Sequence, residues 1–266
     1  MRAPYGTAGT LRAGLRVRVR SPTAQAGGVS LNCEYFGTCP GCDISENLQS
    51  PPLLADAQRF FSERGVRLQT RWGSPRGYRT TAKLAVRREP GGDRVVVGLF
   101  QRGSHNVVPL SNCVVQHPSI NEAVELIQHT LRNSGVVCAY DEASGSGLLR
   151  YVQASVQRDT GRVQLTLVAN ARSPADEAAL PEFAKLLWAA GGGERMWHSI
   201  WLNINTTPNN VIFSHEPGAW QAVLGEQVRI DRYRDTSRSG SRHILDIYLG
   251  REREEGQIGL CLYKCI

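Results

Sequence analysis

The fold is decided by residues 152–167, which read VQASVQRDTGRVQLTL. On each side of the turn at 159–161, apolar and polar residues alternate, which is the pattern of a strand with one buried face. We therefore predict a β-hairpin here. A second hairpin is predicted upstream, where two β-prone runs, 78–88 and 94–100, flank the turn signal PGGD at 90–93.

Three helices are predicted around these hairpins. The first begins at Ser50-Pro51, the second begins with a capping box formed by Ser119 and Glu122, and the third begins at Ser173-Pro174. A further strand is expected at 199–205. This order predicts an α+β fold with a mostly antiparallel sheet and helices on one face, preceded by a cysteine-rich loop.

The positive charge of the chain is concentrated in one stretch. All 266 residues together carry a net charge of +7, while residues 59–102 alone hold eleven Arg and Lys against three acidic residues, a net charge of +8. A local basic band is typical of polyanion binding, and RNA or DNA is favoured over a membrane because no amphipathic basic helix accompanies it. A solvated Arg-rich surface is the alternative.

Four cysteines form the strongest candidate site. Cys33, Cys39 and Cys42 have the spacing C-x5-C-x2-C, and Cys113 follows the upstream hairpin. Thiolates suit an iron–sulfur cluster or zinc, and three ligands in one loop with a distant fourth favour iron–sulfur, because structural zinc is usually held by two close pairs. Reduced thiols without a metal are the alternative. The cysteines without partner spacing, which we expect to be idle, are Cys138, Cys261 and Cys265.

Composition divides the chain into four segments. Residues 1–30 hold five arginines and no acidic residue, as in a transit peptide or a disordered arm, which favours a plastid or mitochondrial location. Residues 31–118 carry the cysteines and the basic hairpin, and residues 119–226 form an α+β domain of an RNA-recognition type. Residues 227–266 are a divergent tail that we expect to pack poorly. The sequence has no run of about 20 apolar residues, the length that a membrane-spanning helix needs.

Several blocks of the sequence together resemble one enzyme family. The blocks are CEYFGTCPGC at 33–42, GYRTTAKLAV at 77–86, SHNVV at 104–108, LRYVQ at 149–153 and NNVIF at 209–213. Over residues 31–226 the chain resembles the uracil-C5 RNA methyltransferases that bind a [4Fe-4S] cluster and make 5-methyluridine in 23S rRNA or tRNA. The version here is similar to their plant and algal branch.

The resemblance implies the chemistry. Cys33, Cys39, Cys42 and Cys113 would ligate the cluster, and the partner would be a structured rRNA or tRNA with an exposed uridine. In the family, a cysteine thiolate adds to C6 of uracil, S-adenosylmethionine gives the methyl group to C5, and a base removes the C5 proton. These groups lie in a C-terminal Rossmann-like domain that residues 227–266 do not match. We therefore expect no Rossmann-like methyltransferase domain, cofactor site or catalytic residue in this chain, and no activity of the chain alone.

The RNA contacts are expected in the basic stretch and beside it. Arginine binds phosphate with paired hydrogen bonds, and tyrosine stacks on an exposed base. The expected contacts are Arg71, Arg76, Tyr78, Arg79, Lys83, Arg87, Arg88 and His105. Two other classes of protein stay open, a small iron–sulfur redox protein and a zinc-stabilised interaction module.

Overall fold

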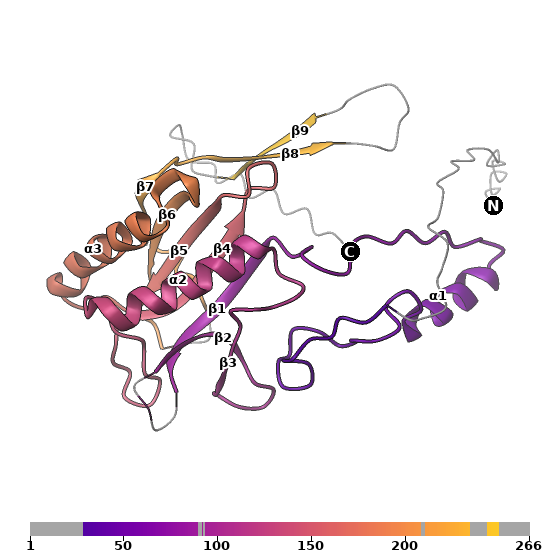
Figure 1. Cartoon of the computed structure of the whole chain (residues 1–266), viewed down its shortest axis with the longest axis horizontal. Helices are drawn as coiled ribbons and strands as arrows, with labels where there is room; N and C mark the ends of the chain where they lie inside the picture. Colours follow the sequence, from indigo (N-terminus) through magenta and orange to yellow (C-terminus); the bar gives the residue numbers. More distant parts are fainter. Residues whose placement is uncertain (1–28, 90–91, 93, 209–210, 235–243, 250–266) are drawn as a thin grey trace, which may run out of the picture.

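The computed structural model describes residues 29–89, 92, 94–208, 211–234 and 244–249 (Figure 1). The arm expected at 1–30 therefore lies almost wholly outside the described residues, as do Cys261, Cys265 and much of the tail at 227–266. Within the described ranges, no helix is long and apolar enough to cross a membrane.

The body of the protein is one seven-stranded sheet with the order β3-β2-β1-β4-β5-β6-β7. Its strands are β1 (Thr81–Arg88), β2 (Val95–Phe100), β3 (Val107–Pro109), β4 (Leu149–Val156), β5 (Val163–Ala169), β6 (Trp197–Ile204) and β7 (Trp220–Gly225). Both predicted hairpins are confirmed, because β1 pairs with β2 and β4 pairs with β5, each in antiparallel register.

One strand pair departs from the predicted antiparallel pattern. β5 and β6 are adjacent and parallel, with Leu165 opposite Ile200, and helix α3 (Pro174–Ala190) connects them. Parallel neighbours need a long crossover, and a strand–helix–strand unit is the building block of Rossmann-like sheets. The sheet is therefore mixed, and the predicted α+β fold, with a mostly antiparallel sheet and no Rossmann-like methyltransferase domain, does not account for this strand–helix–strand unit. Alternation of apolar residues reports which face of a strand is buried and carries no information on strand direction.

Two helices cover one face of this sheet. Helices α2 (Pro118–Ser134) and α3 lie side by side across it (Figure 1), and the short 3-10 helix η1 (Gly193–Arg195) follows α3. Ile120 and Ile127 of α2 and Leu180 and Phe183 of α3 are fully buried. They join the strand side chains in one apolar cluster, and each such side chain contributes about 1.5–3 kcal/mol by leaving water.

The two helices begin in different ways. At the start of α3, the Ser173 hydroxyl accepts a hydrogen bond from the Asp176 amide, and the Asp176 carboxylate accepts one from the Ser173 amide. The capping box predicted at Ser119 and Glu122 is wrong. His117 is the N-cap of α2, and its Nδ1 accepts a hydrogen bond from the Ser119 amide at 3.2 Å.

Two parts of the chain extend from the body. Helix α1 (Pro52–Ser62) has no buried residue and lies apart from the sheet (Figure 1). Strands β8 (Arg229–Arg234) and β9 (Ile244–Leu249) form a separate two-stranded sheet. Within the range expected to pack poorly, Arg229 and Asp231 are buried and form an ion pair of 2.9 Å. The Gln157 side chain donates to the Ile230 carbonyl at 3.0 Å, which joins β8 to the body.

Gly98 tests the packing between β2 and β3. A Cβ at this position would lie 1.8 Å from the Val108 carbonyl oxygen, so the two strands would have to separate. We expect Gly98→Ala to lower the free energy of unfolding by about 1–3 kcal/mol or more, as measured by urea unfolding. Gly73→Ala is the control, because a Cβ there has no neighbour within 4 Å, and it should change the value by less than about 0.5 kcal/mol. Equal effects of the two substitutions would contradict this reading.

Candidate functional site

Four sulfur-bearing side chains face one small cavity. Cys33, Cys39, Cys42 and Cys113 all line it, and most of the remaining lining is apolar. Cys113 is buried, the other three are partly buried, and all four are free thiols. The fold therefore brings together the four cysteines that the sequence singled out, although Cys113 is 71 residues beyond Cys42.

Backbone hydrogen bonds fix the loop that carries three of these cysteines. The Leu31 amide donates to the Ser45 carbonyl at 2.8 Å, and the Leu48 amide donates to a carbonyl at residue 29, which closes the loop at its base. Inside the loop, the Cys39 amide donates to the Tyr35 carbonyl at 2.8 Å. The loop is thus tied at its base and tightened by a turn around Cys39.

Cys113 is held by helix α2. Asn121 uses both ends of its side-chain amide, because its Oδ1 accepts from the Cys113 amide at 3.2 Å and its Nδ2 donates to the Cys113 carbonyl at 3.1 Å. The next two carbonyls along the chain accept hydrogen bonds from the amides of Gly77 and Arg79. Cys113 therefore lies where α2 and the segment before β1 meet.

Two of the four thiols have a raised pKa. Burial raises the pKa of Cys39 and of Cys42, and the nearby sulfurs of Cys33 and Cys113 raise it further. The Arg79 guanidinium opposes both shifts without reversing them. Metal ligands are thiolates, so binding of a metal in this cavity has to displace protons.

The four cysteine sulfurs have the chemistry and the number that a thiolate-bound metal group requires. Four cysteines are the usual ligands of a [4Fe-4S] cluster, and they also bind structural zinc. As the side chains are placed, no group of three or more Cys, His, Asp or Glu residues among the described residues has the spacing of a metal site. The structure thus brings the donors to one cavity without closing them around a metal.

The residues expected to contact RNA divide into an exposed group and an internal group. The exposed side chains are those of Arg71, Arg76, Tyr78, Lys83, Arg88 and His105. Arg76, although exposed, donates to the carbonyls of Ser30 and Leu31. Arg79 is partly buried at the cysteine cavity and donates to the Gly41 carbonyl at 3.2 Å.

Arg87 belongs to the internal group, with 6% of its surface exposed. It forms an ion pair with Glu142 and donates to the carbonyls of Val86 and Arg150 at 2.8 Å each. Three aromatic rings have their centroids 5.1–5.3 Å from its guanidinium carbon: Phe100, Tyr140 and Tyr151. Because this guanidinium is satisfied inside the protein, burial argues against a direct RNA contact by Arg87.

Sequence reasoning missed several neighbours of the expected contacts. Glu142 lies 2.6 Å from the Nδ1 of His105, so it joins an expected RNA contact to the buried Arg87. Lys83 places its Nζ 4.8 Å from the centroid of the Phe213 ring, which in turn lies 5.2 Å from the Trp220 ring. These neighbours come from distant loops and strands, and no motif spacing links them.

Comparison with known proteins finds RNA methyltransferases. No family model matches the chain. A protein of Protochlamydia amoebophila named an uncharacterized RNA methyltransferase is 34% identical over 198 residues, which cover 74% of this chain and 50% of that protein. A Bacillus cereus protein of the same description is 28% identical over 209 residues, which cover 74% of this chain and 42% of that protein. The chain therefore spans half or less of the length of these relatives.

A solved structure is similar in fold. It is the Pyrococcus abyssi tRNA (uracil-54, C5)-methyltransferase in complex with S-adenosyl-L-homocysteine, with a TM-score of 0.51 and 17% sequence identity over 73% of this chain and 42% of that one. This likeness, together with the mixed sheet, overturns the expectation that the chain contains no Rossmann-like methyltransferase fold.

Glu142 tests the internal network around Arg87. Burial raises the pKa of Glu142, but hydrogen bonds and positive charge from Arg87 and His105 outweigh burial, so the pKa lies below the ordinary value of 4.5. A lowered pKa contributes stability that is present at neutral pH and is lost as the pH falls below about 4.5. We expect Glu142→Gln to be less stable than the native chain by about 1–3 kcal/mol at pH 7, with a difference that narrows as the pH falls through this range.

Urea unfolding at a series of pH values measures this difference. Glu125→Gln is the matched control, since Glu125 is exposed on α2, and it should show no such narrowing. A difference for Glu142→Gln that stays constant with pH would contradict the assigned network.

Proposed function

The chain is related in sequence to RNA methyltransferases over about three quarters of its length, and from this relationship we propose a function for it. It is the RNA-binding and [4Fe-4S]-bearing portion of an S-adenosylmethionine-dependent RNA methyltransferase that acts at C5 of uracil. The observation that carries the proposal is that Cys33, Cys39, Cys42 and Cys113 line one cavity, as the family resemblance requires of cluster ligands.

The cysteine cavity supports the cluster part of this proposal. Its donors are four thiols and its remaining walls are mainly apolar, which suits a sulfur-ligated iron cluster shielded from water. A cluster here would join the loop at 33–42 to Cys113 and so to α2, and in that position it would stabilise the fold. The Cys39 sulfur already accepts a hydrogen bond from the Gly41 amide at 3.3 Å, a contact that favours the thiolate form.

The exposed basic side chains support the RNA part. An enzyme that reacts at a ring carbon of a base has to take that base out of its stack, so the RNA must be held around an unpaired nucleotide. Arg71, Lys83, Arg88 and His105 are exposed and can bind phosphates, and Tyr78, whose surface is 52% exposed, can stack on a base. The proposed partner is a structured rRNA or tRNA with an accessible uridine.

The similar solved structure supports the proposed cosubstrate. That enzyme was solved with S-adenosyl-L-homocysteine, the compound left when S-adenosylmethionine has given up its methyl group. At 17% identity the comparison supports the proposed class of cosubstrate and assigns no residue to its binding.

Metal content tests the cluster assignment. We expect the chain purified without oxygen to be brown and to hold about four iron ions, because four thiolates ligate one [4Fe-4S] cluster. Cys113→Ser should lose most of this iron, whereas Cys138→Ser should retain it, since Cys138 is exposed and outside the cavity. A colourless protein with bound zinc would replace the proposal by a zinc-stabilised module, and a brown protein without RNA affinity would favour a redox protein.

Salt dependence tests RNA binding. If about four phosphates are neutralised, the logarithm of the affinity for single-stranded RNA should fall with the logarithm of salt concentration at a slope near −3, about −0.7 per contact. Lys83→Ala should reduce the slope by about 0.7. Lys185→Ala on α3 is the matched control, because Lys185 is exposed and pairs with Glu182 outside the basic stretch, and it should leave the slope unchanged. An affinity independent of salt would remove the RNA proposal.

A further inference from the structure

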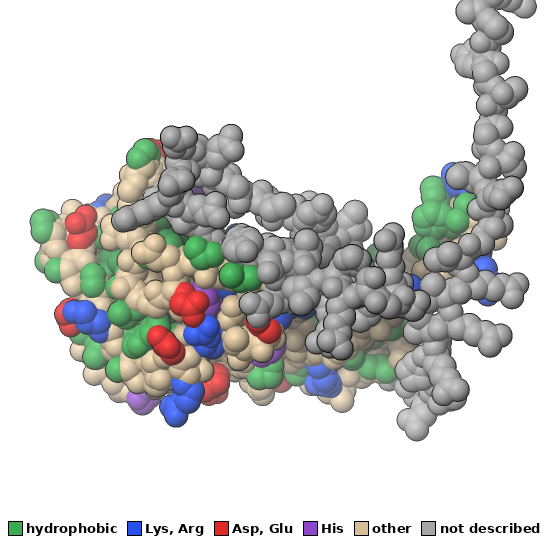
Figure 2. Space-filling view, turned by 90° about the horizontal axis from the view of Figure 1, so that it is seen from above, with side chains coloured by type: hydrophobic (Ala, Val, Ile, Leu, Met, Phe, Trp, Pro, Cys, Tyr) green, Lys and Arg blue, Asp and Glu red, His purple; other side chains and the backbone are tan. Residues whose placement is uncertain are grey.

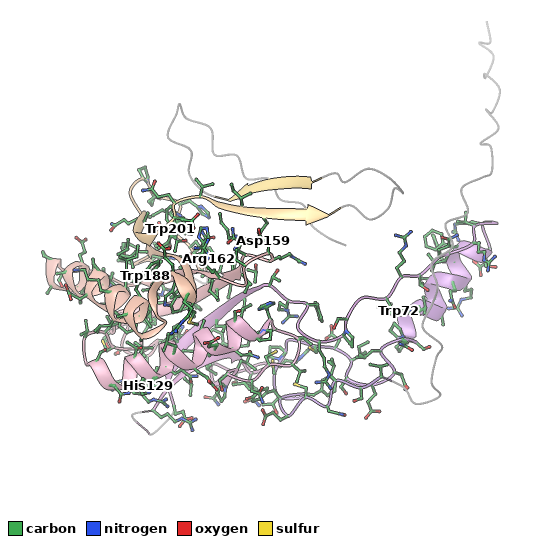
Figure 3. All side chains as sticks on the ribbon, turned by 45° about the horizontal axis from the view of Figure 1, so that its top comes forward. Trp72, His129, Asp159, Arg162, Trp188 and Trp201 are labelled. Atoms are coloured by element: carbon green, nitrogen blue, oxygen red, sulfur yellow. The ribbon has the colours of Figure 1, made fainter. Side chains whose placement is uncertain are left out.

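An extended segment leads from α1 back to the sheet. We call residues 66–78 the strap; it contains no helix or regular strand. Figure 3 shows Trp72 on this segment beside α1, away from helices α2 and α3. The strap is therefore presented to solvent at one end of the molecule.

Trp72 is the most unusual side chain of the strap. It is 50% exposed, although an indole is among the costliest side chains to leave in water. Within the described part of the chain, no ring stacking, cation–π contact or hydrogen bond holds the Trp72 side chain. By contrast, Trp197 and Trp201 are buried in the body. Tryptophan is enriched at binding interfaces, because its ring is apolar over most of its surface and carries one N–H donor.

The charge of the strap identifies the kind of partner. Residues 66–78 contain three arginines and no acidic residue. Arg67 and Arg71 are exposed, and among the described residues neither makes an ion pair or a side-chain hydrogen bond. At α1 and directly after it the situation differs, because Arg59 pairs with Asp56 and the guanidinium carbon of Arg64 lies 3.7 Å from the centroid of the Phe60 ring. The guanidiniums of Arg67 and Arg71 can bind a polyanion, and Trp72 can stack on a flat apolar group of the same partner.

The base of the strap is fixed to the cysteine cavity. The Gly77 amide donates to the Val114 carbonyl at 3.0 Å, directly beside Cys113. The Arg76 guanidinium donates to the carbonyls of Ser30 and Leu31, before the cysteine loop. The strap is thus held at the wall that the cysteines line, while its middle stays accessible.

We propose that the strap is a single-stranded RNA-binding element, in which Trp72 stacks on an unpaired base and Arg67 and Arg71 bind the flanking phosphates. This inference rests on the proposed function, since it assumes that the chain binds RNA. Single-stranded RNA offers both features that the strap matches, a phosphate at every nucleotide and a base face free to stack. A protein partner would be expected to use the apolar side chains of α1, which Figure 2 shows as hydrophobic side chains at this end of the molecule and which include Leu53 and Phe60.

The test is binding of a labelled single-stranded oligouridine by the full chain, purified without oxygen and measured by fluorescence anisotropy at several salt concentrations, with the variants compared at the same salt. Trp72→Ala should weaken binding about 5- to 150-fold, the range for loss of one base–aromatic stack, and Trp72→Phe should recover most of it. Arg71→Ala should weaken binding and reduce the salt slope by about 0.7. Leu53→Ala, at a site 79% exposed on α1, is the control and should bind as the native chain does.

The outcomes separate this inference from the proposed function. If the native chain binds the oligouridine and Trp72→Ala binds equally well, the strap inference fails and the RNA-binding proposal stands. If the native chain does not bind, both fail. A loss of RNA binding with Leu53→Ala equal to that with Trp72→Ala would overturn the inference, because the loss would then not depend on a stacking side chain in the strap. Unchanged thermal unfolding of the Trp72 variants shows that the losses do not come from misfolding.

Discussion

Three main-chain hydrogen bonds join the segment before β1 to the segment before α2. The amides of Gly77 and Arg79 donate to the carbonyls of Val114 and Val115, and the His117 amide donates back to the Arg79 carbonyl, at 2.9–3.0 Å. At this short ladder the wall of the cysteine cavity, the first strand of the sheet and the start of α2 meet. The cavity depends on it, because the ladder sets the position of the distant cysteine relative to the loop that carries the other three.

The elements with a local signature were predictable from the sequence. Both hairpins follow from β-prone or alternating runs around turn residues, and the start of α3 follows from Ser173 and Pro174. The parallel pairing of β5 with β6 was not predictable in this way, because side-chain alternation is the same in either direction. The start of α2 was mispredicted at Ser119, since a histidine imidazole two residues earlier accepts the hydrogen bond that the serine was expected to receive.

At the candidate site too, the features encoded by neighbouring residues were predictable, and those that depend on distant residues were not. Cysteine spacing identified the four donors, and their meeting in one cavity depends on the fold. Charge counted along the chain does not show which basic side chains are exposed. Arg87 is enclosed by rings and a carboxylate, and Arg79 faces the thiols, so both contribute to the +8 of the basic stretch without contributing free charge to the surface. The exposed Trp72 lay within the same stretch and was passed over, because a single aromatic residue has no periodic pattern.

The pairing of β1 with β4 has a consequence for how the chain reaches this structure. Thr81 and Ser155 are partners in the middle of the sheet, although 74 residues separate them. The hairpins β1–β2 and β4–β5 close over short loops and can form early. The pairing of β1 with β4 forms later, because it closes a long loop that contains α2 and therefore has a larger entropic cost. Refolding of this protein should therefore be slow relative to that of a helical bundle of similar size, and the unpaired edges of β1 and β4 should be open to aggregation during that delay.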